Sequence, residues 1–445
     1  MDELEFLELI EKKKYFEIKE KLSEMNEVDV AELLDPLDTH TTLLIFRMLP
    51  KDLAVDVFAN FSKDQRLRFI NLITDKELQD IIDELFFDDM IDLIEEMPAN
   101  IVNKILMASK ADERKLINQF LKYPQDSGGT IMTIEYVDLK KSMTVREALA
   151  HIKKIGITKE TVYTCYVTNR NRVLEGFVSL RTLVVSDLDD RIEDIMEREV
   201  IYVHTNEDQE TIAAMFRRYG FLAIPVVDHE DRLTGIITVD DIMEVMEQEA
   251  TEDFQIMAGM SPTEDEYLNT KVWNLARHRL PWLFILMITA TVTARIMGRF
   301  EDVLASVIIL NTFIPMLMDT GGNSGSQSST LIIRGLATGE IETSDWLKVM
   351  WKELRVSLIV GVVLSLANFL RLVYIENADF LIALTVSLTL IVTVTSAKVV
   401  GGSLPLIAKK LKLDPAIMAG PLITTVVDAL SLFVYFSIAS LLLGI

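Results

Sequence analysis

The stretch F-I-P-M-L-M-D-T-G-G-N-S-G-S-Q, residues 313–327, places a carboxylate, glycines and two side-chain amides inside an otherwise apolar segment. Apolar residues resume at Leu331. In hydrocarbon, backbone N–H and C=O groups without partners are costly unless they face protein or water. An ionisable residue at that depth, here Asp319, indicates a functional site. We therefore expect this stretch to line a hydrophilic path through a bilayer and to break the span that carries it.

The charge of the chain divides it into two parts. The chain has 44 Lys and Arg residues and 68 Asp and Glu residues. Only 12 of the basic and 11 of the acidic residues lie from Arg279 onward. Residues 1–278 therefore hold 32 basic and 57 acidic residues, a net charge of −25. This excess argues against a nucleic-acid partner, which requires a basic surface. It either serves solubility or collects hard cations, which prefer carboxylate oxygens. The single Cys165 cannot form an internal disulfide and fits a reducing compartment.

Residues 1–127 predict a helical domain, because apolar residues recur every three or four positions and breakers are sparse. Short helices in tandem indicate a small superhelical, all-α domain. Acidic residues gather late in this region, at Asp88, Asp89 and Asp92. Such a run is either a solvated face or part of a cation site.

Residues 128–190 and 191–246 form an internal repeat in the order β-α-β-β-α, with strands expected at 162–167 and 222–227. The segment N-R-N-R-V-L-E-G-F-V-S of the first copy aligns with D-H-E-D-R-L-T-G-I-I-T of the second. This α/β repeat resembles a tandem pair of CBS domains, which regulate an attached protein and perform no chemistry themselves.

The second copy ends in Gly-x-x-Thr-x-x-Asp, at Thr238 and Asp241. The resemblance to CBS domains implies that these two residues are candidates for binding a nucleotide ribose, with ATP as the expected nucleotide. The first copy departs from the pattern, since it has Ser179 but Thr182 at the Asp position.

A strongly acidic connecting helix is expected over residues 247–278, continuing from the end of the repeat. Carboxylates on successive turns repel one another and destabilise an isolated helix. A divalent cation that bridges them to acidic groups of the N-terminal region would relieve this repulsion. An ordinary soluble linker helix is the alternative.

Residues 279–445 predict a membrane domain of five spans, since each candidate segment is near the roughly 20 apolar residues that a bilayer requires. The expected spans are 280–298, 303–336, 354–374, 380–406 and 417–443. We expect a multi-pass protein of the plasma membrane. The positive-inside rule predicts that the N-terminal and repeat domains lie in the cytoplasm and that Ile445 lies outside. On the expected inner side lie Arg277, Arg279, Arg334, Lys348, Lys352, Lys409, Lys410 and Lys412; on the outer side Arg299 and Arg371 lie beside Glu301, Asp302, Glu376 and Asp379.

The last span carries Asp428 in the sequence G-P-L-I-T-T-V-V-D, with Thr424 one turn earlier and Thr425 beside it. A carboxylate in a mainly apolar span must face water, a cation or a partner. A protonated Asp hydrogen-bonded to another helix is the structural alternative.

The order of these parts, with the Pro315 to Gln327 motif and Asp428, closely resembles the MgtE family of magnesium channels over essentially the whole chain. The resemblance implies a homodimer with a pore on its two-fold axis, lined by the second and fifth spans. A hydrated Mg²⁺ would be held by Asp428 with Thr424 and Thr425. The pore wall would include Pro315, Gly322, Asn323, Gly325 and Gln327.

The same resemblance implies that cytosolic Mg²⁺ closes the pore by binding to the acidic domains. The residues expected to form this sensor are Asp88, Asp89, Asp92, Asp228, Asp241, Glu244, Glu249, Glu252 and Asp253. We expect no enzyme and no catalytic residues. A broader divalent transporter for Co²⁺, Mn²⁺ or Ni²⁺ stays open. A remote alternative is an intramembrane aspartyl enzyme, because Asp319-Thr320-Gly321 spells the aspartic-protease triplet and Asp428 could share its proton.

Overall fold

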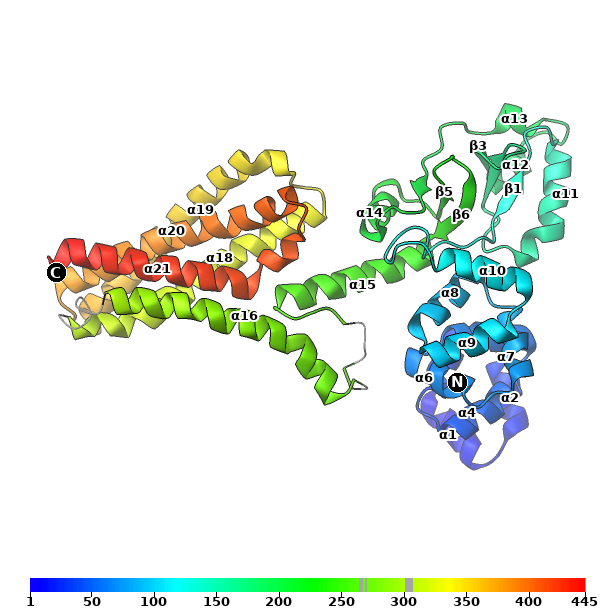
Figure 1. Ribbon diagram of the computed structural model, residues 1–445, viewed down its shortest axis with the longest axis horizontal. Coiled ribbons are helices and arrows are strands. Elements are labelled where there is room, and N and C mark those ends of the chain that lie inside the picture. Colours follow the sequence, from blue (N-terminus) through cyan, green and yellow to red (C-terminus); the bar gives the residue numbers. More distant parts are fainter. Residues whose placement is uncertain (264–266, 269, 301–306, 445) are drawn as a thin grey trace. The chain divides into compact units, whose positions relative to one another are not determined.

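The computed structural model describes residues 1–263, 267–268, 270–300 and 307–444 (Figure 1). By its internal contacts the chain divides into two compact units, Met1–Met246 and Glu247–Ile445. Each unit is described by itself.

The first unit begins with ten short helices, each of which packs mainly against helices one or two places away in the chain. Neighbours such as α1 and α2, α3 and α5, and α7 and α9 are in contact, and the phenyl rings of Phe46, Phe58, Phe61 and Phe69 meet in the core. This arrangement agrees with the predicted N-terminal helical domain. The helices are α1 Glu3–Glu11, α2 Tyr15–Leu22, α3 Glu27–Leu34, α4 Thr39–Phe46, α5 Lys51–Ala59, α6 Lys63–Ile70, α7 Asp75–Ile82, α8 Phe87–Glu96, α9 Ala99–Ala108 and α10 Ala111–Phe120.

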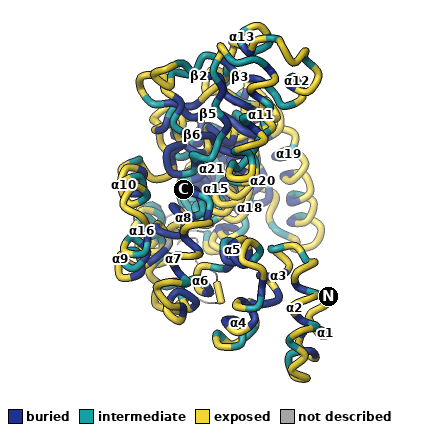
Figure 2. The backbone as a smooth tube through the Cα atoms, turned by 90° about the vertical axis from the view of Figure 1, so that its right-hand side faces the viewer, coloured by how far each residue is buried: buried dark blue, intermediate teal, exposed yellow. Residues whose placement is uncertain are grey.

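Two three-stranded sheets follow, with orders β1-β2-β3 and β4-β5-β6. In each sheet a parallel pair is followed by an antiparallel hairpin, and the register shifts at equivalent places, Val167/Thr168 and Val226/Val227. All five residues of β5 are buried, and Figure 2 colours the tube by burial. The equivalence supports the predicted repeat. The strands are β1 Val137–Leu139, β2 Thr164–Thr168, β3 Leu174–Ser179, β4 Val203–His204, β5 Ala223–Val227 and β6 Leu233–Thr238, and the helices are α11 Val145–Ile155, α12 Leu180–Val185, α13 Ile192–Ile195 and α14 Gln209–Tyr219.

The acidic connecting helix differs from the prediction in its bounds. It is α15, Val239–Met257, and it starts immediately after β6, so its first turns belong to the first unit. It ends well before residue 278. A turn at Gly259, which has a φ of +70°, follows it.

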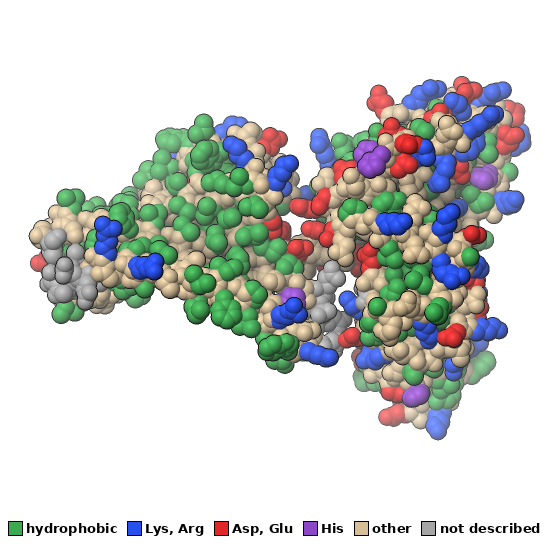
Figure 3. All heavy atoms as spheres, in the orientation of Figure 1, with side chains coloured by type: hydrophobic (Ala, Val, Ile, Leu, Met, Phe, Trp, Pro, Cys, Tyr) green, Lys and Arg blue, Asp and Glu red, His purple; other side chains and the backbone are tan. Residues whose placement is uncertain are grey.

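Among its described residues, the second unit contains five long helices after α15. They are α16 Val272–Arg299, α18 Ile314–Ala337, α19 Trp346–Tyr374, α20 Phe380–Lys410 and α21 Gly420–Leu443. Four are long and apolar enough to cross a membrane by length and composition: Val272–Arg299, Thr343–Tyr374, Phe380–Lys410 and Pro415–Leu443. In Figure 3, hydrophobic side chains dominate the visible surface of this unit.

The helix that carries the opening stretch is not among those four, and it is not broken. A short 3₁₀ turn, Ile308–Phe313, precedes it, and then α18 runs without interruption through the glycines. The expected break was wrong because a continuous helix pairs every backbone group internally, which an apolar environment favours even over glycines. Residues 303–306 of the predicted second span, Glu301 and Asp302 of the orientation argument, and Ile445 lie outside the described residues.

Candidate ion pathway and acidic cluster

α18 has two chemically different faces. Pro315, Asp319, Asn323 and Gln327 recur every four residues and are exposed, and the Asn323 amide donates a hydrogen bond to Asp319 Oδ1 at 3.1 Å. The opposite face carries small or apolar buried residues. These are Leu317, Gly321, Gly322, Ser324, Gly325, Ser328, Ser329, Ile332 and Ile333. A polar row on one side of a helix among apolar helices marks a surface for water, ions or another chain.

The glycines of α18 permit close packing against its neighbours. A Cβ on Gly401 of α20 would lie 2.2 Å from the Gly325 carbonyl oxygen, so the two backbones touch. A Cβ on Gly322 would lie 3.0 Å from Thr424 Cγ2, and one on Gly325 would lie 2.8 Å from Ile423 Cγ2. The structure therefore gives Gly322 and Gly325 a packing role within the chain, and that they also shape a pore wall stays a prediction. Small residues at helix crossings are typical of membrane proteins.

Asp428 lies on α21, which packs against α18. Its side chain is half-buried, and it is close enough to Asp319 for the two charges to repel. The hydroxyls of Thr424 and Thr425 both donate to the Pro421 carbonyl at 2.9 Å, so each hydroxyl oxygen keeps lone pairs for another ligand. The predicted pore residues of the second and fifth spans are thus on two helices in contact.

Carboxylates from three parts of the first unit interact around α8. Burial raises the pKa of Asp88 to about 7, and the charges of Asp89 and Glu135 add to the effect. Burial likewise raises the pKa of Asp241 to about 7, followed by repulsion from Asp88. Burial raises the pKa of Asp89 to about 6, although Arg66 acts in the opposite direction. Because these carboxylates repel one another, the carboxylates of α8 lie near those of the first turn of α15.

Asp92 and Glu160 complete this acidic cluster, which we define as Asp88, Asp89, Asp92, Glu160, Asp241 and Glu244. Burial raises the pKa of Glu160, with repulsion from Asp88 as the next cause. Partial desolvation by the surrounding protein raises the pKa of Asp92, with repulsion from Glu244 as the next cause. Asp92 is exposed, so water screens part of its shift. Sequence analysis missed Glu160, which follows the 3₁₀ turn Gly156–Thr158 and has no acidic neighbours along the chain.

The cluster is not a closed ligand sphere. Across the residues that the structure describes, no three His, Cys, Asp or Glu side chains converge as direct ligands of a metal ion. Mg²⁺ releases its water reluctantly and is commonly bound through retained waters by one or two carboxylates. Buried carboxylates that repel one another fit such an ion, because its charge removes the repulsion.

Other predicted sensor residues lie elsewhere. Asp228 is in the β5–β6 turn, where its Oδ1 accepts bonds from the N–H groups of Glu230 and Arg232 at 2.8 and 3.0 Å. This turn role is sufficient to explain the side chain. Glu249, Glu252 and Asp253 lie on the later turns of α15, in the second unit.

The two candidate nucleotide residues bond to each other. The Thr238 hydroxyl donates to Asp241 Oδ2 at 2.6 Å, immediately before α15. In the first copy, the Ser179 and Thr182 hydroxyls lie 2.8 Å apart at the start of α12. Both pairs therefore stabilise a helix N-terminus, and Asp241 belongs to the acidic cluster as well.

The end of α15 and the turn that follows it contact α16 and α21 within the second unit. A Cβ on Gly420, the first residue of α21, would lie 2.6 Å from the Met257 carbonyl oxygen. A Cβ on Gly259 would lie still closer to the indole of Trp282 on α16, and Ser261 N–H donates to the His278 carbonyl at 3.0 Å. The end of α15 is therefore in direct contact with the start of the helix that carries Asp428.

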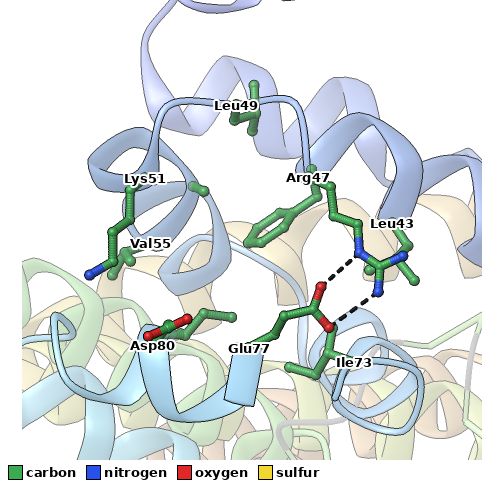
Figure 4. A pocket seen from close by; sticks show the side chains of 11 residues that line it. Leu43, Arg47, Leu49, Lys51, Val55, Ile73, Glu77 and Asp80 are labelled. Atoms are coloured by element: carbon green, nitrogen blue, oxygen red, sulfur yellow. Dashed lines mark hydrogen bonds and ion pairs between the residues drawn. The ribbon is translucent and has the colours of Figure 1, made fainter. Parts of the chain in front are cut away.

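A cavity of about 210 Å³ lies among the N-terminal helices, with walls that include Leu43, Val55 and Ile73 (Figure 4). Arg47 and Glu77 pair at its rim through two hydrogen bonds of 2.7 and 3.2 Å. Its lining shares no residue with the acidic cluster, so it does not form part of that site.

Three family models match the chain. A divalent cation transporter model, MgtE, matches residues 314–438; the MgtE intracellular N domain matches residues 25–126; and a CBS domain matches residues 192–248. The first match covers most of α18 to α21, and the second covers most of the ten N-terminal helices.

Proteins of known name are similar over nearly the full length. The magnesium transporter MgtE of Thermus thermophilus is 36% identical over 96% of this chain and 95% of its own. That of Bacillus subtilis is 33% identical over 93% of both chains. A solved cytosolic domain of the Mg²⁺ channel MgtE in complex with ATP is 31% identical, with a TM-score of 0.52, over 55% of this chain and 100% of that one. The solved soluble part of a magnesium transporter is also 31% identical, with a TM-score of 0.52, over 56% of this chain and 98% of that one.

Proposed function

This chain belongs to the MgtE family of divalent cation transporters, and we propose that it is a magnesium-selective channel through which Mg²⁺ enters the cell across the plasma membrane. It is a transporter and not an enzyme, so the aspartyl-enzyme interpretation of Asp319 and Asp428 is set aside. The predicted helical N domain, CBS domains and helical region with candidate spans agree with this family.

One observation carries the proposal: the polar row of α18 is exposed in a helix packed among apolar ones, beside Asp428 of α21. Exposed Asp319, Asn323 and Gln327 have no favourable place against lipid. A second copy of the chain that faces this row would enclose a wet path. Asp428 from each copy would then bind a hydrated Mg²⁺ by outer-sphere contacts, which are weak enough to release it.

We further propose that cytosolic Mg²⁺ closes this path through the acidic cluster and the later carboxylates of α15. The raised pKa values of Asp88 and Asp241 support this proposal, because they indicate that negative charge in the cluster is unfavourable without a cation. When Mg²⁺ binds there, α8 and the first turn of α15 are held together. The contact of Met257 with Gly420 would carry this restraint to α21.

The relative solved with ATP supports ATP as a ligand of the CBS pair here, with Thr238 and Asp241 as its candidate contacts. The proposed topology places both cytosolic domains inside and the C-terminus outside. A broader specificity that includes Co²⁺, Mn²⁺ or Ni²⁺ is the second candidate, since carboxylate and carbonyl oxygens also bind Mn²⁺ and similar ions.

The test is Mg²⁺ flux into proteoliposomes that contain the full-length protein. Asp428→Ala should abolish flux while the protein elutes as the same oligomer as the wild type. Glu340→Gln, which removes an exposed charge outside the proposed pore, is the matched control and should conduct normally. Flux close to wild type in Asp428→Ala would reject the pore assignment, and equal competition by Co²⁺, Mn²⁺ and Ni²⁺ would favour the broader specificity.

A further inference from the structure

A lysine, a serine and a glutamate from three helices meet inside the second unit, away from the exposed row of α18. The Ser328 hydroxyl of α18 donates to Glu353 Oε2 of α19 at 2.5 Å, and Lys398 Nζ of α20 donates to Ser328 Oγ at 3.5 Å. Only 8% of Glu353 and 5% of Lys398 is exposed. We propose that these residues form a charged clamp that positions α18 for conduction, an inference that rests on the proposed channel function.

The chemistry of the clamp makes it sensitive to the loss of any member. One hydroxyl accepts from the ammonium and donates to the carboxylate, so Ser328 uses both of its capacities. Charged groups within membrane segments are rare and costly, and they are kept where they pair with one another. If one charge is removed, the other stays buried without its partner, whereas removal of both leaves no unpaired charge.

The surrounding helices are shaped to bring the charges together. A Cβ on Gly402 of α20 would lie 3.3 Å from Glu353 Cγ and 3.2 Å from Met350 Cε. α20 thus has no side chain where α19 presents Glu353. The clamp therefore depends on the close approach of α19 and α20 and is not an accidental contact of long side chains.

Three consecutive residues of α18 connect the clamp to the proposed pore. Gln327 is exposed on the polar row, Ser328 binds the two charges, and Ser329 donates to the Met418 carbonyl at 2.8 Å. Met418 lies just before Gly420, where α21 begins. A shift or rotation of α18 at Ser328 would therefore move the polar row and the start of the Asp428 helix together. The three clamp residues are positioning residues, since none of them is on the exposed row.

The experiment measures Mg²⁺ flux per folded protein, and the Mg²⁺ concentration for half-maximal flux, in proteoliposomes of the full-length chain. Glu353→Gln and Lys398→Met should each lower flux at least tenfold and shift the half-maximal concentration. The double variant should recover flux to within about threefold of wild type. Ser365→Ala removes a different buried hydroxyl, which donates from α19 to the Ser387 carbonyl of α20, and it should conduct normally.

Two results would overturn the clamp. Single variants that conduct within twofold of wild type, with an unchanged half-maximal concentration, would show that α18 needs no such positioning. A folded double variant that is as defective as the single variants would show that charge pairing is not the cause. If the single variants fail to fold, the double variant and Ser328→Ala still decide the question. Loss of flux in Asp428→Ala with normal flux in all clamp variants would reject this inference alone.

Discussion

Replacing Asp88 with Asn should stabilise the N-terminal end of α8 when Mg²⁺ is absent and the pH is near 7. Asp88 is buried, and its pKa is raised from 3.8 to about 7, chiefly by burial and then by Asp89. That interval is about 3 pH units, or ~4 kcal/mol at 1.36 kcal/mol per unit. Asn keeps the Oδ1 atom that accepts from Asp89 N–H. It cannot ionise, so the penalty disappears.

One opposing effect reduces the gain. Asp88 lies in the first turn of α8, where a negative charge interacts favourably with the helix dipole by about 0.3–1 kcal/mol. Relief of the ionisation penalty outweighs this loss. A neutral residue at position 88 also lets the neighbouring carboxylates ionise further, which restores part of the repulsion, so we expect a net gain of ~2 kcal/mol, or about a 30-fold decrease in local opening.

The sign of the pH dependence follows from the raised pKa. Between pH 3.8 and about 7 the unfolded state has released the Asp88 proton while the folded state retains it. Stability is therefore full below pH 3.8 and falls as the pH rises through 7. Mg²⁺ requires the ionised carboxylates, so its binding should release protons and strengthen with pH over this same window.

The assay is hydrogen exchange of α8 peptides in the full-length protein, corrected for the intrinsic pH dependence of exchange. Without Mg²⁺ at pH 7, Asp88→Asn should exchange about 30-fold more slowly than wild type, and added Mg²⁺ should slow the variant less than the wild type. Asp80→Asn, which neutralises an exposed carboxylate on α7, should leave α8 exchange unchanged. Equal or faster exchange of α8 in Asp88→Asn would refute the reasoning.

Three further predictions concern packing, capping and gating. Gly401→Ala should lower the free energy of unfolding by about 1–3 kcal/mol or more, because the added Cβ would lie 2.2 Å from the Gly325 carbonyl oxygen. Gly298→Ala, where the added Cβ meets open space, should leave the melting temperature in detergent unchanged or higher. A Gly401→Ala variant as stable as the wild type would contradict the contact. Thr238→Val should destabilise the first turn of α15 by about 1 kcal/mol, seen as faster hydrogen exchange there; exchange that is unaltered would mean that the bond to Asp241 is unimportant. Three carboxylates of α15 are to be neutralised together, namely Glu249, Glu252 and Asp253. Mg²⁺ flux through the variant should continue at high internal Mg²⁺. If internal Mg²⁺ still stops the flux as in the wild type, these residues are not part of the sensor.

The repeat could be predicted because its signals are local. A strand expected at 162–167 is observed at Thr164–Thr168, and one expected at 222–227 is observed at Ala223–Val227. The turn residues between paired strands fix each hairpin without help from distant parts of the chain. The bounds shift by one or two residues because the last pairing partner of each strand is set by the neighbouring strand.

The acidic cluster could be predicted only in part. Three of its members are close together in the sequence, so the sequence alone predicts an acidic group there; they are Asp88, Asp89 and Asp92. Glu160 is a single acidic residue beside a short turn, and only the tertiary fold brings it to α8. Glu353 was missed for the same reason: it is an ordinary glutamate at the start of a span until Lys398 and Ser328 are found beside it.

Residues 313–327 combine two periodic patterns on one helix, a row of polar residues and a row of small residues. In the linear sequence the two rows alternate, so they could not be told apart. Glycines and serines that suggested a break lie on the buried face, where Gly325 meets the backbone of Gly401. The residues that suggested a path, Asp319 and Asn323, lie on the other face. Because the faces are separate, substitution of the small residues should change folding first, and substitution of the polar row should change conduction without loss of the fold. If the polar row lines the proposed path, its ion chemistry can vary while the packing surface of α18 is kept.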